Sequence, residues 1–253
     1  MKVLAEKGYR VIAPDQRGYS PNARPTFIKE YSLKHTSSDV LAIANAYNLQ
    51  RFHLVGHDWG ASVGWAFVAE YPERLYSWTS LSIPHMKAFQ EAYRSDFDQQ
   101  RKSKYIRYFN MPFFPELYLS FNGYNNLKNI WRVHDNEEKE AYLSVFRQRG
   151  ALRSALNWYR ANISRRRNPS DHINFGDVEV PTLLIWGNMD MAIGRKSVVL
   201  SEQYMSGPYK FLELYVGHWL IQESFDDVSK AIIKHINTYS LEYYEPQLRR
   251  KKK

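Results

Sequence analysis

A carboxylate stands in a glycine-flanked turn within VGHDWGASVG, residues 55–64. Asp58 lies between Gly56 and Gly60, after the apolar run FHLV and before the helix-like ASVGWAFVAEY. A strand-to-helix elbow of this kind presents one side chain, and a serine there attacks an acyl carbon. Aspartate is ionised at neutral pH without a helper base, but its attack on an ordinary ester would give only a labile anhydride. The residue type therefore favours attack on a saturated carbon that carries a leaving group, as in an epoxide or an alkyl halide. An aspartate that merely caps a helix is the plainer interpretation, and the two glycines after an apolar run argue against it.

Hydrolysis of the resulting alkyl ester requires an activated water, and hence a histidine held by an acid. Among eight histidines, His218 stands out because YVGHWLIQE places it in a glycine-containing turn between the last predicted strand and the last predicted helix. His57 adjoins the nucleophile in sequence, so we expect its side chain to point elsewhere. Asp190 in LLIWGNMD follows the preceding predicted strand, whereas the loop after Ile83 holds no carboxylate. We therefore predict the chain order Asp58, Asp190, His218, which is typical of this elbow architecture.

These three side chains can meet only if several parallel strands end at one edge of a sheet. The hydrophobic pattern predicts strands over 9–14, 51–55, 76–83, 180–187 and 209–215. It predicts helices over 34–48, from about 61 to about 75, near 195–204 and over about 224–239, with Thr36, Ser37 or Ser38 as the N-cap of the first. The stretch from about 85 to 175, which separates the two parts of the chain that contain strands, is polar and rich in aromatic residues, and it is predicted to be helical. We predict a core formed by 1–84 and 176–253, the latter ending in a basic tail, and a helical lid (cap) over 85–175.

Composition excludes several other classes of protein. The absence of cysteine rules out disulfides, cysteine-based zinc sites and thiol catalysis, and we expect neither a metal nor a cofactor. Much of the net charge of +9 lies in SRRRN at 164–168 and LRRKKK at 248–253, outside any recognisable nucleic-acid module. No apolar run approaches the roughly 18 residues of a membrane span. We expect a soluble cytoplasmic protein without nucleic-acid or membrane partners, and leave homo-oligomerisation open.

Three motifs, GHDWG at 56–60, WGNMD at 186–190 and VGHWL at 216–220, together resemble the epoxide hydrolase branch of the α/β-hydrolase superfamily. The similarity runs through almost the whole chain and includes GYRVIAPDQRGYS at 8–20. It implies an α/β fold with a mostly parallel sheet flanked by helices. It also implies that a small apolar epoxide is opened to a vicinal diol through an ester on Asp58, with the Trp59 amide as an oxyanion donor. Haloalkane dehalogenases resemble the same elbow and would bind halide with Trp59 and lid donors, so that alternative stays open.

The resemblance further implies two lid tyrosines that hold and protonate the epoxide oxygen. The segment ALNWYRAN places one role on Tyr159. The segment SKYIRYFNMPFFPE places the other on Tyr105, with Tyr108 as its rival. A phenol is a fitting acid for an alkoxide leaving group, and two donors on one oxygen stabilise the charge that develops there.

One departure from the family bears on activity. The resemblance implies an HGxP loop and several strands before GYRVIAPD, and the sequence contains no such motif. We therefore expect the first strands and the oxyanion loop to be missing, and the 253-residue form to self-associate and to have weak or no activity. A truncated, catalytically inactive α/β-hydrolase homologue is the third hypothesis.

Overall fold

The computed structural model describes residues 1–131, 133–163 and 171–240, which form two compact units. The first unit contains Met1–Val11, Val40–Lys102 and the chain from Ile173 onward, and the second contains Ile12–Asp39 and Ser103–His172. Both basic runs singled out in the sequence, at 164–168 and 248–253, lie outside the described residues. Within the described ranges, no helix combines the length and the apolar character that a bilayer span requires.

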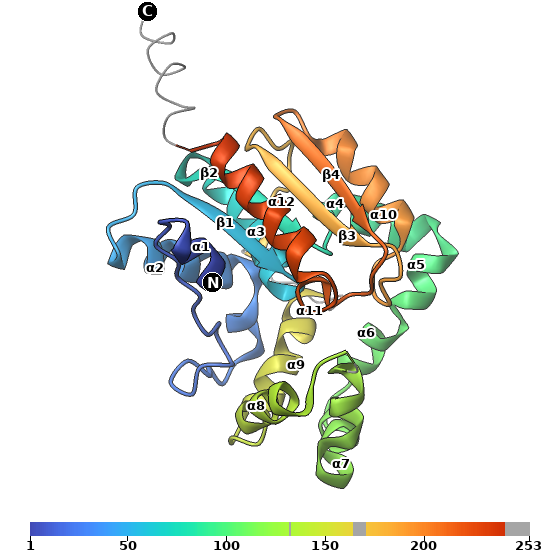
Figure 1. Ribbon diagram of the computed structural model, residues 1–253. Helices are drawn as coiled ribbons and strands as arrows, with labels where there is room; N and C mark the ends of the chain where they lie inside the picture. The colour runs from blue at the N-terminus through green and yellow to red at the C-terminus, as the bar shows by residue number, and fades with distance from the viewer. Residues whose placement is uncertain (132, 164–170, 241–253) are drawn as a thin grey trace, which may run out of the picture. The chain divides into compact units, whose positions relative to one another are not determined.

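The first unit is built on four parallel strands in the order β1-β2-β3-β4 (Figure 1). They are β1 (Phe52–His57), β2 (Leu75–Leu81), β3 (Thr182–Gly187) and β4 (Tyr209–Leu214). Every residue of β3 is buried, as expected for a parallel strand that is covered on both faces. Because all four strands run the same way, their carboxyl ends meet at one edge of the sheet.

Helices cover both faces of this sheet. Those of the first unit are α1 (Lys2–Glu6), α3 (Trp59–Glu70), α4 (Met86–Ser95), α5 (Phe97–Lys102), α10 (Arg195–Val199), α11 (Leu220–Glu223) and α12 (Phe225–Thr238), with 3-10 turns η2 (Pro72–Arg74) and η5 (Leu200–Tyr204). Alternate residues of β3 face opposite sides, as the pleat requires. Ile185 packs with Ile232 of α12, which Figure 1 shows along one face, and Leu184 packs with Val198 of α10. Burial of each such side chain contributes about 1.5–3 kcal/mol.

The second unit is helical and holds together through buried polar contacts. It contains η1 (Ile28–Tyr31), α6 (Lys104–Phe109), α7 (Phe114–Lys128), η3 (Asn129–Trp131), α8 (Asn136–Phe146) and α9 (Ala151–Asn162), and α2 (Leu33–Ala46) begins in it. The buried Trp158 donates its indole N–H to the Arg17 carbonyl at 3.0 Å. On another side of α9, Arg160 forms a two-pronged ion pair with Glu116 at 2.8 and 2.9 Å. These contacts fix α9 within its unit.

Four of the five predicted strands and all four predicted core helices are confirmed within a few residues. The predicted strand over 9–14 is wrong, because that segment forms no β-ladder. Its apolar composition favours a strand, but a strand exists only where a neighbour accepts its ladder hydrogen bonds. Tyr9 is instead held within the first unit by its side chain, which lies edge-on to His53 and donates to Asn237 Oδ1 at 2.5 Å.

The predicted N-caps of the helix over 34–48 are also wrong, because α2 begins at Leu33. The hydroxyls of Ser37 and Ser38 both donate to the Lys34 carbonyl inside the helix, and that of Thr36 bonds carbonyls one turn back. Serine and threonine hydroxyls bond backbone carbonyls in this way when they fall inside a helix.

Between Met86 and Asn162 the described residues form helices α4 to α9 and no strand. The second compact unit takes its helices from this stretch but begins them at Ser103, and it adds the earlier segment Ile12–Asp39. The lid boundaries predicted from the sequence, 85 and 175, stay a prediction.

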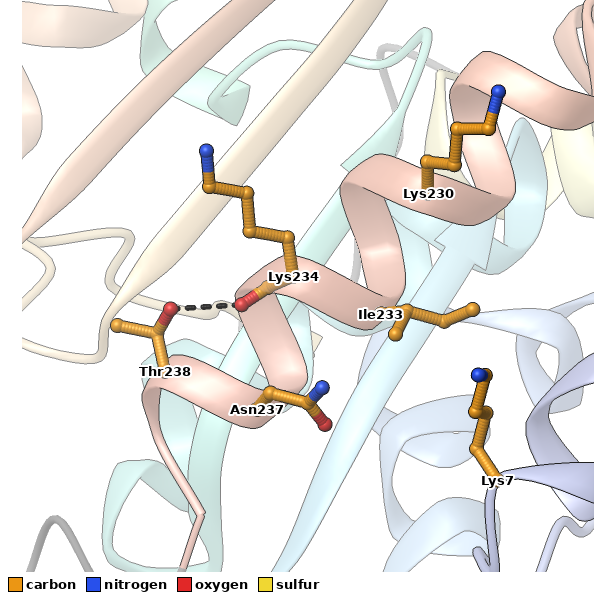
Figure 2. Close-up of a pocket in the computed structure, with 6 residues that line it drawn as sticks. All are labelled: Lys7, Lys230, Ile233, Lys234, Asn237 and Thr238. Carbon is orange, nitrogen blue, oxygen red and sulfur yellow. Dashed lines mark hydrogen bonds between the residues drawn. The ribbon is translucent and has the colours of Figure 1, made fainter.

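A groove of about 570 Å³ lies against α12 (Figure 2). Its lining comprises Lys7, Lys230, Ile233, Lys234, Asn237 and Thr238. Figure 2 shows Thr238 donating its hydroxyl to the Lys234 carbonyl, a bond of 2.7 Å within the helix. None of the residues predicted to do chemistry lines this groove.

Candidate active site

Each of the four strands delivers one polar side chain to a single cluster at the carboxyl edge. Asp58 follows β1 directly, Ser82 follows β2 directly, Asp190 lies three residues after β3, and His218 lies four residues after β4. His218 is hydrogen-bonded to all three of the others. The structure therefore brings together the three residues predicted to form a nucleophile, acid and base set, and adds a serine.

The turn that carries Asp58 is strained. Asp58 has φ 51° and ψ −121°, outside the regions that residues other than glycine ordinarily adopt. The turn is also tight, because a Cβ built on Gly56 would lie 2.4 Å from the Gly60 carbonyl oxygen. Gly56 thus lets the strand approach the helix backbone closely enough to leave the aspartate at the apex.

Gly56→Ala should destabilise the protein by about 1–3 kcal/mol, because the added methyl meets backbone that has to shift. This corresponds to a fall in Tm of roughly 3–10 °C for a chain of this size, measured by differential scanning calorimetry. Gly176→Ala is the matched control, since its Cβ would meet nothing within 4 Å. Equal melting temperatures for Gly56→Ala and the control would contradict the close approach at the elbow.

His218 lies between two carboxylates. Its Nε2 is 3.1 Å from Asp58 Oδ1, and its Nδ1 is 2.9 Å from Asp190 Oδ2. The Asp190 side chain is fully buried and that of His218 is 7% exposed, whereas the Asp58 side chain is 34% exposed. The nucleophile candidate is thus the member of the set that a substrate can reach.

Asp58, His218 and Asp190 stabilise one another's charged forms. Burial opposes the charged form of the His218 imidazole, but hydrogen bonds and charge from Asp190 and Asp58 outweigh it and raise its pKa to about 10. Burial likewise opposes ionisation of both aspartates, and the bonds from His218 overcome it and lower the pKa of each. At neutral pH the free site therefore holds two carboxylates around an imidazolium.

Asp190 is held by contacts that the sequence did not reveal. Its Oδ1 accepts from the backbone amides of Ala192 and Ile193 at 2.7 and 3.0 Å. Lys102, the last residue of α5, donates its ammonium to the Asp190 carbonyl oxygen at 2.5 Å. The buried Gln99, also on α5, donates to the Ala192 carbonyl and accepts from the Gly194 amide at 2.9 and 2.8 Å. Helix α5 thus clamps the loop that carries the acid.

The loop that carries His218 is held in a similar way. Glu223 accepts the amides of Gly217 and Trp219, which flank the histidine, at 2.8 and 3.2 Å. His57 contacts this loop too, because its Nε2–H donates to the His218 carbonyl at 2.8 Å and the two rings lie 4.9 Å apart. The expectation that His57 points away from the site is therefore wrong. Alternation along β1 separates its side chain from that of Asp58, but the His218 loop folds back over it.

Trp59 contributes its backbone rather than its ring to the nucleophile. Its amide donates to Asp58 Oδ2 at 2.6 Å. The two oxygens of Asp58 are therefore distinguished, because Oδ1 faces His218 and Oδ2 faces the amide of the next residue. The oxyanion role predicted from the sequence for this amide stays a prediction.

The lid tyrosines are described within the second unit alone. The rings of Tyr105 on α6 and Tyr159 on α9 lie edge-on, with centroids 6.0 Å apart. Phe109 packs against both of these rings. Tyr108, the rival of Tyr105, packs instead against Tyr118, and its hydroxyl donates to a backbone carbonyl of α7 at 3.2 Å. The rings of the two tyrosines first assigned thus pack against each other, whereas Tyr108 packs against Tyr118 and Phe109.

The comparisons with known proteins agree with the fold. A model of the alpha/beta hydrolase fold family matches residues 1–224, so the chain belongs to that family. Among its relatives, human Epoxide hydrolase 4 is 32% identical over 236 residues, which are 88% of this chain and 64% of the human protein. The chain therefore spans a little under two thirds of that relative's length.

Two further matched proteins are covered over a larger share of their own length. The AB hydrolase superfamily protein YfhM of Bacillus subtilis is 30% identical over 242 residues, 93% of this chain and 83% of that protein. The crystal structure of Epoxide Hydrolase A from Mycobacterium thermoresistibile superposes with a TM-score of 0.72 at 25% identity, over 90% of this chain and 82% of that one. The sequence resemblance and the predicted fold class are thereby confirmed.

Proposed function

We propose that the chain is an epoxide hydrolase that converts a small apolar epoxide into a vicinal diol through a covalent ester on Asp58. The proposal rests on one observation. The Asp58 carboxylate occupies the apex of the elbow, and its Oδ1 lies 3.1 Å from Nε2 of His218, whose Nδ1 is hydrogen-bonded to Asp190. The epoxide hydrolases among its relatives support the same chemistry.

In the first step Asp58 Oδ1 attacks a ring carbon, and the bond between that carbon and the epoxide oxygen breaks. Oδ1 is the oxygen assigned to attack because the Trp59 amide occupies Oδ2. The ring oxygen leaves as an alkoxide and takes a proton from a lid tyrosine, which is reprotonated from solvent. The product is an alkyl ester whose carbonyl oxygen is Oδ2, beside the Trp59 amide.

In the second step His218 takes a proton from a water, and the resulting hydroxide attacks the ester carbonyl carbon. The imidazole has to be neutral for this, whereas in the free site its pKa is about 10. Ester formation removes the negative charge of Asp58 and so lowers the pKa of His218, which then loses its proton to solvent. The negative oxygen that develops at Oδ2 is stabilised by the Trp59 amide, and the diol leaves with Oδ1 after taking the proton back from His218. The carboxylic acid that remains on Asp58 passes its proton to His218, which restores the carboxylate and the imidazolium of the free site.

Tyr159 and Tyr105 are assigned as the two donors to the epoxide oxygen. The assignment comes from the resemblance of their segments to the family. The edge-on packing of the two rings, at 6.0 Å, supports Tyr105 over Tyr108 as the partner of Tyr159. Two phenols on one oxygen would share the charge that develops as the ring opens.

Tyr159→Phe should slow the formation of the ester by roughly 10- to 1000-fold, because one positioned donor is lost, and leave ester hydrolysis little changed. Stopped-flow single-turnover measurements on an epoxide separate the two rates. Tyr105→Phe should behave similarly, and Tyr108→Phe serves as the control with no effect on either rate. A silent Tyr105→Phe together with a slow Tyr108→Phe would reverse the second assignment.

The test of the proposed function is a comparison of two substrates. Purified protein incubated with styrene oxide should yield the diol, and the same protein with a chloroalkane should release no halide. Asp58→Ala is the control for both reactions. Halide release without diol would identify a dehalogenase, and neither product would identify an inactive homologue, so either result contradicts the proposal.

A further inference from the structure

Ser82 is a buried residue at the active-site edge with no role so far. It directly follows β2, is completely inaccessible to solvent, and its amide continues the sheet by donating to the Ile185 carbonyl at 2.8 Å. Its hydroxyl reaches two members of the catalytic set: it donates to Asp190 Oδ2, and it lies 3.0 Å from His218 Nδ1.

The direction of these hydrogen bonds follows from the groups involved. An ionised carboxylate only accepts and offers about four acceptor positions. Oδ1 of Asp190 takes two backbone amides, and Oδ2 takes the Ser82 hydroxyl and His218 Nδ1–H, so all four are used. Because the serine proton goes to Asp190, the serine oxygen is left to accept a share of the same Nδ1–H. Ser82 thus fixes the carboxylate and the imidazole relative to each other, with the bare Nε2 toward Asp58 when His218 is neutral.

The backbone of Ser82 indicates that its side chain is there for a reason other than stability. Its φ is 72°, in the left-handed region where glycine is favoured and other residues are strained. A glycine would satisfy this backbone better and still make the amide bond to Ile185. Strained residues that persist in this way gather at functional sites.

We propose that Ser82 is a positioning residue for ester hydrolysis, whose hydroxyl holds Asp190 and His218 in the geometry that activates water. The inference rests on the proposed function for its kinetic consequence. Its structural content, a hydroxyl shared between a carboxylate and an imidazole, can be measured without any substrate. The effect falls on the second step because His218 acts as a base only there.

Ser82→Gly tests the proposal, since it removes the hydroxyl and relieves the backbone. We expect a Tm equal to or above that of the unmodified protein, ester formation within threefold, and ester hydrolysis slower by roughly 10- to 100-fold, the worth of one hydrogen bond to a charged group. Stopped-flow single turnover separates the rates. Ser80→Ala is the matched control, because it deletes a buried hydroxyl of the same strand that donates to the Ile83 carbonyl at 2.6 Å.

A second readout needs no reaction. In ¹H–¹⁵N spectra of histidine-labelled protein, the His218 Nδ1–H proton should shift measurably in both Ser82→Gly and Ser82→Ala and stay in place in Ser80→Ala. An unchanged signal in both Ser82 variants would overturn the inference whether or not the protein opens epoxides. If the signal shifts but Ser82→Gly hydrolyses the ester at the unmodified rate, the positioning role is overturned as well. Failure of the unmodified protein to form any ester would contradict the proposed function alone.

Discussion

Asp58→Ala should abolish epoxide turnover, with a loss of about 10,000-fold or more in kcat/KM, because no other group can form the ester. The variant removes the carboxylate at the elbow apex and leaves the Trp59 amide and the Asp190–His218 pair in place. Measurement of diol formation by chromatography gives the rate. The two steps of the proposed mechanism both pass through this residue, so the loss should be larger than that from any lid substitution.

Two controls show whether a loss of activity in Asp58→Ala comes from the missing carboxylate itself. Its Tm shows whether the strained elbow still folds, and Asp226→Ala, which removes an exposed carboxylate at the start of α12, should leave turnover unchanged. A folded Asp58→Ala variant that retains a tenth or more of the activity would rule out Asp58 as the nucleophile.

His218→Gln should separate the two steps of the reaction. Asp58 remains ionised at neutral pH, so the ester should still form, but no base is present to activate water for its hydrolysis. We expect steady-state turnover to fall by about 10,000-fold or more, and intact-protein mass spectrometry to find one substrate molecule attached per chain. Proteolytic digestion should place the added mass on the peptide that contains Asp58.

Two further variants sharpen the test of His218. Asp190→Ala should also accumulate ester, because it leaves the imidazole without the carboxylate that orients it. His172→Gln, at an exposed position, should behave like the unmodified protein. If His218→Gln turns over epoxide without accumulating ester, water attacks the epoxide directly and the covalent mechanism is wrong.

The sequence predicted the position of Asp58, Asp190 and His218 because each follows a strand, and the strands are parallel. Their meeting at one edge is a consequence of topology, and the glycine spacing marked the elbow. The helices and four of the strands were predictable for a similar reason, since their apolar periodicity is strong. The segment over 9–14 is apolar like the true strands, but it forms no β-ladder. Whether a neighbouring strand is available to pair with it depends on the fold and cannot be predicted from the segment alone.

The supporting contacts of the site could not be read from the sequence. Ser82, Gln99 and Lys102 are ordinary residue types in unremarkable segments, and their roles depend on bonds across 88 to 136 residues of chain. The contact of His57 with the His218 loop was not predicted. The alternation of side chains along a strand predicts the face of the sheet on which a side chain lies, but it does not predict which loop packs on that face. The roles of Tyr105 and Tyr159 rest on the resemblance of their segments, and the kinetic variants test them.

The most direct measurement of the central claim follows the source of one oxygen atom. With enzyme in excess over epoxide in water enriched in heavy oxygen, a single turnover should give a diol whose two oxygens are both light, one from the epoxide and one from Asp58 Oδ1. The heavy oxygen should appear in the Asp58 carboxylate, detected by mass spectrometry of its peptide. A heavy oxygen in the diol of that first turnover, with the Asp58 peptide unlabelled, would show direct attack by water and contradict the ester mechanism.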